Sequence, residues 1–198
     1  MPEVTQTPEH ADATAGPSDA PAVTNDDQTA GRSDAPAAAN DDQLITYPSA
    51  QFPGPPSVSV QIPSDWAPVR VLGAHMAARR VDTDSSFAPN IVVRGYVRDD
   101  AFTLADAIDE LREHVEGLPD GQVDAPFDIE IGDAPFVGCN VSWHDPELGQ
   151  VVQVHLFTAA ARSKRIDVVQ VTGSVCGDGA VDDYATLRGI LESVAVTR

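Results

Sequence analysis

The chain has 198 residues, of which 31 are acidic and 12 are basic, and its formal net charge is −19. This charge excludes a nucleic-acid-binding protein, because phosphate contacts need clustered Lys and Arg. It also opposes docking on an anionic membrane surface. No apolar run approaches the ~18 residues that a membrane-spanning helix needs. We therefore expect no integral membrane segment, and we expect the partner to be an unknown protein or a small ligand.

The beginning of the chain predicts a cytoplasmic location. A secretory signal combines a basic segment with an apolar run. The opening residues, MPEVTQTPEHADATAG, contain neither of these and no lipid-acceptor Cys. Export without a leader would leave no such trace, so leaderless export is the alternative.

Residues 1–43 differ from the rest of the chain in composition. They contain no Leu, Ile, Phe, Tyr or Trp, and they carry nine acidic side chains against one basic side chain. Such a segment cannot bury enough apolar surface to offset the entropy of ordering it. Within it, SDAPA followed by NDDQ occurs at 18–28 and again, 15 residues later, at 33–43. The sequence therefore predicts a disordered acidic tail with a two-copy repeat, followed by a single domain over 44–198.

The predicted strands of this domain share a period of two or a run of β-branched residues, both of which are typical of sheets. They cover approximately 58–62, 71–78, 90–98, 135–144, 150–158 and 165–173. The turn sequence DPELG separates the fourth strand from the fifth, which predicts a hairpin.

Two other segments show the helical spacing of apolar residues. In the first, this spacing runs from Leu104 to Val115, Thr103 is a suitable N-cap, and a Gly-Leu-Pro-Asp-Gly segment beginning at Gly117 ends the helix. The second covers about 181–193 and carries acidic residues at its positive end. The order of strands, helix, strands and helix predicts an α+β fold, in which an antiparallel β-sheet is flanked by two main helices.

The two cysteines, Cys139 and Cys176, are predicted to be buried and not bonded to each other. In a simple meander, the strands over 135–144 and 165–173 both neighbour the strand over 150–158 and lie about 9.5 Å apart. A disulfide needs Cα atoms within about 7 Å. The spacing of the cysteines is also not a zinc pattern.

Motifs that would carry catalysis or hold a cofactor are missing from the sequence. It contains no G-x-S-x-G nucleophile elbow and neither of the glycine-rich phosphate-binding patterns. Its five histidines include no pair spaced at i,i+2 or i,i+4, the spacing that favours a metal site. We therefore expect no catalytic residues, no metal and no cofactor.

Two short motifs resemble a known family. Residues 62–66 read IPSDW and residues 87–93 read FAPNIVV, and both are similar to motifs of the actinobacterial LpqN/LpqT lipoprotein family. A capped helix ending in Leu-Pro follows them here, as it does in that family. The resemblance covers about 55–195. It implies the PsbP-like fold, which is an antiparallel sheet flanked by helices. Proteins with this fold are mainly accessory or partner-binding proteins. The resemblance carries over no catalytic site.

A polar stripe on the predicted hairpin gives the candidate binding site. If the turn over 145–149 places Ser142 opposite Gln153, then Asn140 lies opposite His155 on the same face. Buried sheet faces exclude such a run, because each unpaired buried polar group costs about 1–3 kcal/mol. Either this face is solvated or its four polar side chains line a binding cleft. A slip of one residue in the register would separate them.

Two hypotheses about function follow from these observations. The first is a non-enzymatic binding or accessory module, in which Asn140, Ser142, Gln153 and His155 contact the ligand or partner. The second is a small hydrolase or lyase that uses His155 with Ser142 or Asn140. The missing nucleophile motifs favour the first, because a hydrolase needs a nucleophile held by a base and oriented donors for the developing charge.

Overall fold

The computed structural model describes residues 45–81, 83, 86–177 and 179–197, and the predicted tail over 1–43 lies outside this part of the chain. Within the described residues, the helices are α1 (Leu104–Glu116) and α2 (Ala180–Leu191). The strands are β1 (Ser57–Ser59), β2 (Trp66–Val69), β3 (Met76–Arg80), β4 (Asn90–Asp99), β5 (Gln122–Val123), β6 (Phe127–Ile131), β7 (Ala134–Asp145), β8 (Gly149–Arg162), β9 (Arg165–Cys176) and β10 (Ala195–Thr197).

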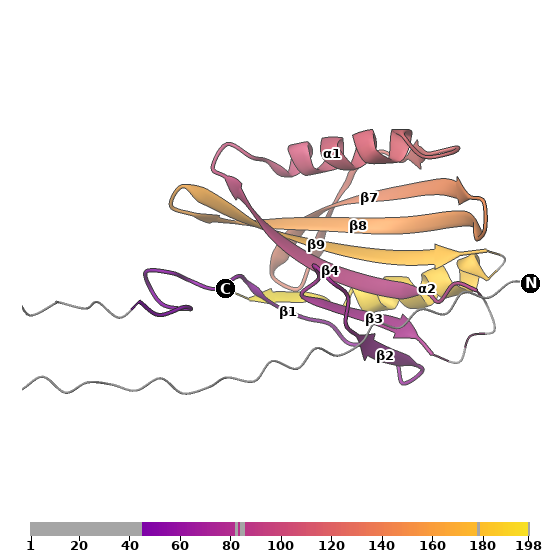
Figure 1. Cartoon of the computed structure of the whole chain (residues 1–198), viewed down its shortest axis with the longest axis horizontal. Helices are drawn as coiled ribbons and strands as arrows, with labels where there is room; N and C mark the ends of the chain where they lie inside the picture. Colours follow the sequence, from indigo (N-terminus) through magenta and orange to yellow (C-terminus); the bar gives the residue numbers. More distant parts are fainter. Residues whose placement is uncertain (1–44, 82, 84–85, 178, 198) are drawn as a thin grey trace, which may run out of the picture. The chain divides into compact units, whose positions relative to one another are not determined.

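Eight of the described strands form one antiparallel sheet (Figure 1). Its order is β2-β3-β4-β9-β8-β7, after which β5 and β6 each pair with part of β7. Strands β1 and β10 form a separate antiparallel pair. The α+β prediction, an antiparallel sheet flanked by two main helices, is therefore confirmed. The meander of β7, β8 and β9 also places β8 between the cysteine-bearing strands, and both Cys139 and Cys176 are buried and free, as predicted.

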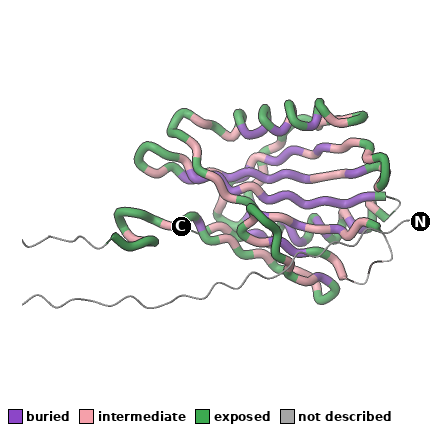
Figure 2. Tube along the Cα trace, viewed as in Figure 1, coloured by how far each residue is buried: buried purple, intermediate pink, exposed green. Residues whose placement is uncertain are grey.

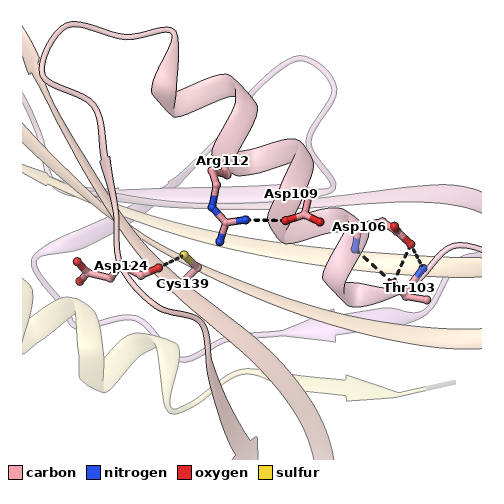
Figure 3. Close-up of polar contacts among 6 residues, drawn as sticks. All are labelled: Thr103, Asp106, Asp109, Arg112, Asp124 and Cys139. Atoms are coloured by element: carbon pink, nitrogen blue, oxygen red, sulfur yellow. Dashed lines mark hydrogen bonds and ion pairs between the residues drawn. The ribbon is translucent and has the colours of Figure 1, made fainter.

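Helix α1 begins and ends where the sequence predicts. The Thr103 hydroxyl accepts a hydrogen bond from the backbone N–H of Asp106, and the Asp106 carboxylate accepts one from the backbone N–H of Thr103, which together form a capping box (Figure 3). The Thr103 hydroxyl also donates to the Asp106 carboxylate, and this bond together with that from the Thr103 backbone N–H holds the pKa of Asp106 below its usual value. The buried side chains of α1 all lie on one face of the helix: Ala107, Ile108, Leu111 and Val115.

Helix α2 has a different N-terminus. Its N-cap is Gly179, which offers no side chain to the first N–H groups. In its first turn, the buried Asp183 forms an ion pair with Arg80 of β3. This pair ties the start of α2 to the sheet.

The sheet buries both of its faces, because successive side chains of a strand point in opposite directions. On one face, α2 packs over alternate residues of the central strands, including Val93, Leu156 and Val171. On the other face, α1 packs over apolar residues that include Cys139, Phe157 and Val168. Figure 2 shows the result as nearly continuous burial along β8 and β9, whereas α1 is buried only on its inner side.

The predicted strand over 71–78 is wrong in its first half. In the structure, β2 and β3 pair with each other, and residues between them form a turn in which Gly73 has φ 72°. That backbone conformation breaks a strand and favours glycine. The alternation continues through the turn only by chance, and Leu72, at its tip, is fully exposed.

Candidate functional site

The register of the β7–β8 hairpin differs by one residue from the predicted register. Ser142 lies opposite Val152, and Gln153 lies opposite Val141. The physical reason is a short turn. The Asp145 carboxylate accepts hydrogen bonds from the backbone N–H groups of Glu147 and Leu148, and Gly149, at φ 83°, pairs directly with Asp145.

This shift divides the four predicted site residues between the two faces of the sheet. Asn140 lies on the α2 face, where its amide oxygen accepts a hydrogen bond of 3.5 Å from the Tyr184 hydroxyl, and Ser142 follows it on the same face. Gln153 and His155 lie on the α1 face. The hydrolase arrangement, His155 with Ser142 or Asn140, is therefore not formed.

His155 is the centre of a hydrogen-bonded network on the α1 face. Its Nε2 lies 2.9 Å from the side-chain oxygen of Gln153, and the Gln153 amide nitrogen donates to the Ser174 hydroxyl at 3.0 Å. Its Nδ1 lies 3.0 Å from the Gln170 amide nitrogen and 3.2 Å from the Thr172 hydroxyl. With these partners, Nε2 carries the proton and donates to Gln153, while Nδ1 accepts.

This imidazole is neutral at physiological pH. Burial, together with the positive charge of Arg94 and the nearby His114, lowers the pKa of His155 from 6.5 to about 4. His155 is 5% exposed, and its ring stacks on that of Phe157, with the ring centroids 6.1 Å apart. His155 therefore serves as a fixed hydrogen-bonding group and does not carry a charge.

A cavity of about 380 Å³ lies above this network, between α1 and the sheet. We call it the polar pocket. Its floor comes from β8 and β9, one wall comes from β4, and α1 forms the opposite wall. Its lining includes Arg94, Tyr96, Arg98, Glu110, Leu111, His114, Trp143, Gln153, His155, Phe157, Gln170 and Thr172. The cavity has the size and the mixed polar and apolar lining of a small-molecule site.

Sequence reasoning missed the part of the site that β4 and β9 supply. Gln170 and Thr172 lie on β9, and Arg94 lies on β4 directly opposite Gln170. A signal for β9 was present, because polar Gln170, Thr172 and Ser174 alternate with small or apolar residues. Such alternation predicts a polar stripe on that strand too, beside the strand over 150–158 in the predicted meander, but it does not reveal that β4 pairs with β9 on the other side.

The described residues contain no group of three His, Cys, Asp or Glu side chains that could hold a metal ion. In the same part of the chain, no helix has the length and apolar character needed to cross a membrane.

Comparisons with known proteins show the fold. No family model matches the chain, and no curated protein matches it. Among solved structures, LpqN of Mycobacterium tuberculosis, described as involved in cell envelope biogenesis, is similar with a TM-score of 0.62 at 15% identity, over 74% of this chain and 86% of that one. The PsbP protein CyanoP of Synechocystis sp. PCC 6803 matches with a TM-score of 0.44 at 13% identity, over 72% of this chain and 94% of that one.

These comparisons bear on two predictions. The likeness to LpqN confirms the fold that the sequence motifs implied. The predicted cytoplasmic location is corrected, because the LpqN structure belongs to a protein of cell envelope biogenesis and points away from the cytoplasm. That prediction depended on a missing signal motif, and a missing motif carries no positive information about the compartment.

Proposed function

We propose that this protein is a non-enzymatic binding module of the cell envelope, distantly related to the LpqN/LpqT family, and that its ligand occupies the polar pocket. The observation that carries the proposal is the cavity of about 380 Å³ over the His155 network. A sheet face covered by a helix is normally apolar. The α1 face instead places Gln153, His155, Gln170 and Thr172 together beneath the polar pocket.

The state of these groups favours binding over catalysis. A general base must have a pKa near the working pH and reach the proton that it removes. His155 has a pKa of about 4 and is hydrogen-bonded at both ring nitrogens. The two groups that could have served it as nucleophile or orienting partner, Ser142 and Asn140, lie on the other face of the sheet. The polar pocket therefore offers fixed donors and acceptors, which bind a ligand without transforming it.

A fragment screen followed by NMR tests the binding site. The chain has two tryptophans, of which Trp143 lines the polar pocket and Trp66 lies in the core under α2. Binding in the polar pocket should shift the indole resonance of Trp143 and leave that of Trp66 unchanged. Gln170→Leu should weaken the selected fragments at least tenfold. Gln150→Leu, at an exposed position of β8 outside the polar pocket, is the matched control.

Two results would contradict this proposal. One is a set of fragments that all shift resonances elsewhere and bind Gln170→Leu and wild type alike. The other is turnover well above background in an esterase, phosphatase and peptidase panel that His155→Ala abolishes. The envelope location is tested separately by fractionation of the source cells with an antibody to residues 45–198; recovery in the cytosol alone would contradict it.

A further inference from the structure

The charges around the polar pocket differ from those of the whole domain. From residue 44 onward, the chain carries 22 acidic and 11 basic side chains. The polar pocket reverses this ratio, because its lining includes Arg94 and Arg98 but only one carboxylate, that of Glu110. A local excess of positive charge in a strongly acidic protein selects for an anionic ligand.

The two arginines play different parts. Arg98 is occupied: it forms an ion pair of 2.9 Å with Glu110 of α1, and its guanidinium lies 4.6 Å from the ring centroid of Tyr96 and 5.2 Å from that of Phe102. Arg94 makes no ion pair with any residue that the structure describes. Arg94 is exposed and lines the polar pocket, so the donors of its guanidinium remain available.

The groups beside Arg94 complete a site for a small molecule with one charge. Gln170, its direct neighbour across the strands, donates one hydrogen bond to His155. Its amide oxygen and its second N–H make no hydrogen bond within the described residues, so they can serve a ligand. Next to them, Leu111, Trp143 and Phe157 line the same cavity and supply apolar contact. The His155 imidazole is neutral, so it provides no positive charge to pair with a second anionic group on the ligand.

We propose that the polar pocket binds a small organic monocarboxylate, whose carboxylate pairs with Arg94 and whose body lies between α1 and the floor. This inference rests on the proposed function. A guanidinium binds a carboxylate through two parallel hydrogen bonds. One free guanidinium matches one negative charge, whereas a phosphate ester carries between about 1.5 and 2 charges at neutral pH.

Three probes of the same ring size test this inference: benzoate, the uncharged benzamide and phenyl phosphate. Their affinities are measured by NMR titration, with the Trp143 indole and the Gln170 amide as reporters and the Trp66 indole as internal reference. Benzoate should bind at least tenfold more tightly than benzamide, and more tightly than phenyl phosphate. Arg94→Gln should abolish the preference for benzoate. Arg79→Gln removes an exposed arginine from the same face of the sheet but outside the polar pocket, and should retain the preference.

The outcomes separate the two proposals. Equal binding of benzoate and benzamide in the polar pocket would overturn the charge preference and leave the binding module intact. Tighter binding of phenyl phosphate, lost in Arg94→Gln, would overturn the choice of carboxylate. A benzoate preference that survives Arg94→Gln would overturn the role of Arg94. Failure of all three probes and of the fragment screen to shift Trp143 would overturn both the inference and the proposed function.

Discussion

The two faces of the sheet are built from alternate residues of the same strands, yet they differ in composition. On the α2 face, β8 and β9 present Val154, Leu156, Val169 and Val171, all at most 5% exposed. One residue along each strand, the α1 face presents Gln153, His155, Gln170 and Thr172. The difference teaches that the α2 face carries the larger apolar cluster, whereas on the α1 face a smaller apolar cluster lies beside polar groups that are available to a ligand.

Close packing of α2 against β9 explains the burial at the centre of the α2 face. Gly173 of β9 lies directly under Leu187, and a Cβ at this position would lie 2.7 Å from the leucine methyl groups. The helix therefore approaches the sheet closely at this point. A cavity of about 200 Å³ beside it has a largely apolar lining that includes Ile129, Leu156 and Leu191, whereas the cavity above His155 is lined by polar side chains as well.

The largest expected effect is on the α2 face. Leu187 is fully buried in its core, so Leu187→Ala should lower the free energy of unfolding by about 2–5 kcal/mol, through lost apolar contact and the cavity left behind. Urea denaturation measures this change. Val181→Ala, on the same helix at a position that is 83% exposed, should change it by less than about 0.5 kcal/mol. Equal losses in both variants would contradict the assignment of the stabilising face.

The next largest effect is a pH dependence of the free energy of unfolding that comes from His155 on the α1 face. Above pH 6.5, His155 is neutral in both the folded and the unfolded chain. Between pH 6.5 and about 4, the His155 imidazole is protonated in the unfolded chain but not in the folded protein, because its pKa in the folded protein is lowered to about 4, mainly by burial. Stability should therefore fall as the pH drops through this window, by about 3 kcal/mol from this residue.

Urea denaturation of wild type and His155→Gln at several pH values isolates this contribution, because the carboxylates are common to both proteins. The slope between pH 6.5 and 4 should be smaller in His155→Gln. His144→Gln, which removes an exposed histidine outside the polar pocket, is the matched control. If His155→Gln does not fold, an NMR titration of His155 in the wild type decides: an ordinary pKa near 6.5 would contradict the buried neutral imidazole.

A third prediction tests the close approach of α2. Gly173→Ala should lower the free energy of unfolding by about 1–3 kcal/mol, because its Cβ would overlap the Leu187 side chain. Gly189→Ala is the contrasting variant, since a Cβ there meets nothing within 4 Å. It should stabilise the protein by up to about 1 kcal/mol through its helix propensity. Thermal unfolding followed by circular dichroism compares the two, and a stable Gly173→Ala would contradict the tight packing.

Local signals explain which parts of the fold could be predicted from the sequence. The helix after Thr103 combines a cap, an apolar stripe and a stop signal within a few turns, and α1 was predicted almost to the residue. The long strands β7, β8 and β9 carry their alternation over many residues. Short strands offer too few positions for a period, so β2, β5, β6 and β10 were missed.

The candidate site was harder to predict, because it depends on register and on neighbouring strands. A single residue in the Asp145–Gly149 turn decides whether Asn140 shares a face with His155 or lies on the other side of the sheet. The pairing of β4 with β9 brings Arg94 beside Gln170, which lies 76 residues further along the chain. No local pattern encodes such a contact. Two of the four predicted side chains, Gln153 and His155, nevertheless lie in the polar pocket.

The smallest expected effect on the free energy of unfolding comes from the N-terminus of α1, the helix that covers the polar pocket. Thr103→Ala removes the hydroxyl that accepts from the Asp106 N–H, so it should lower the free energy of unfolding by about 1 kcal/mol. The same change should raise the pKa of Asp106 toward its usual value, because the Thr103 hydroxyl is the largest cause of its depression. NMR titration of the Asp106 carboxyl provides this second readout. Thr186→Ala, an exposed threonine of α2 outside any cap, is the control. An unchanged Asp106 pKa in Thr103→Ala would show that the capping box does not hold the start of α1, and that the wall of the polar pocket is kept in place by its apolar face alone.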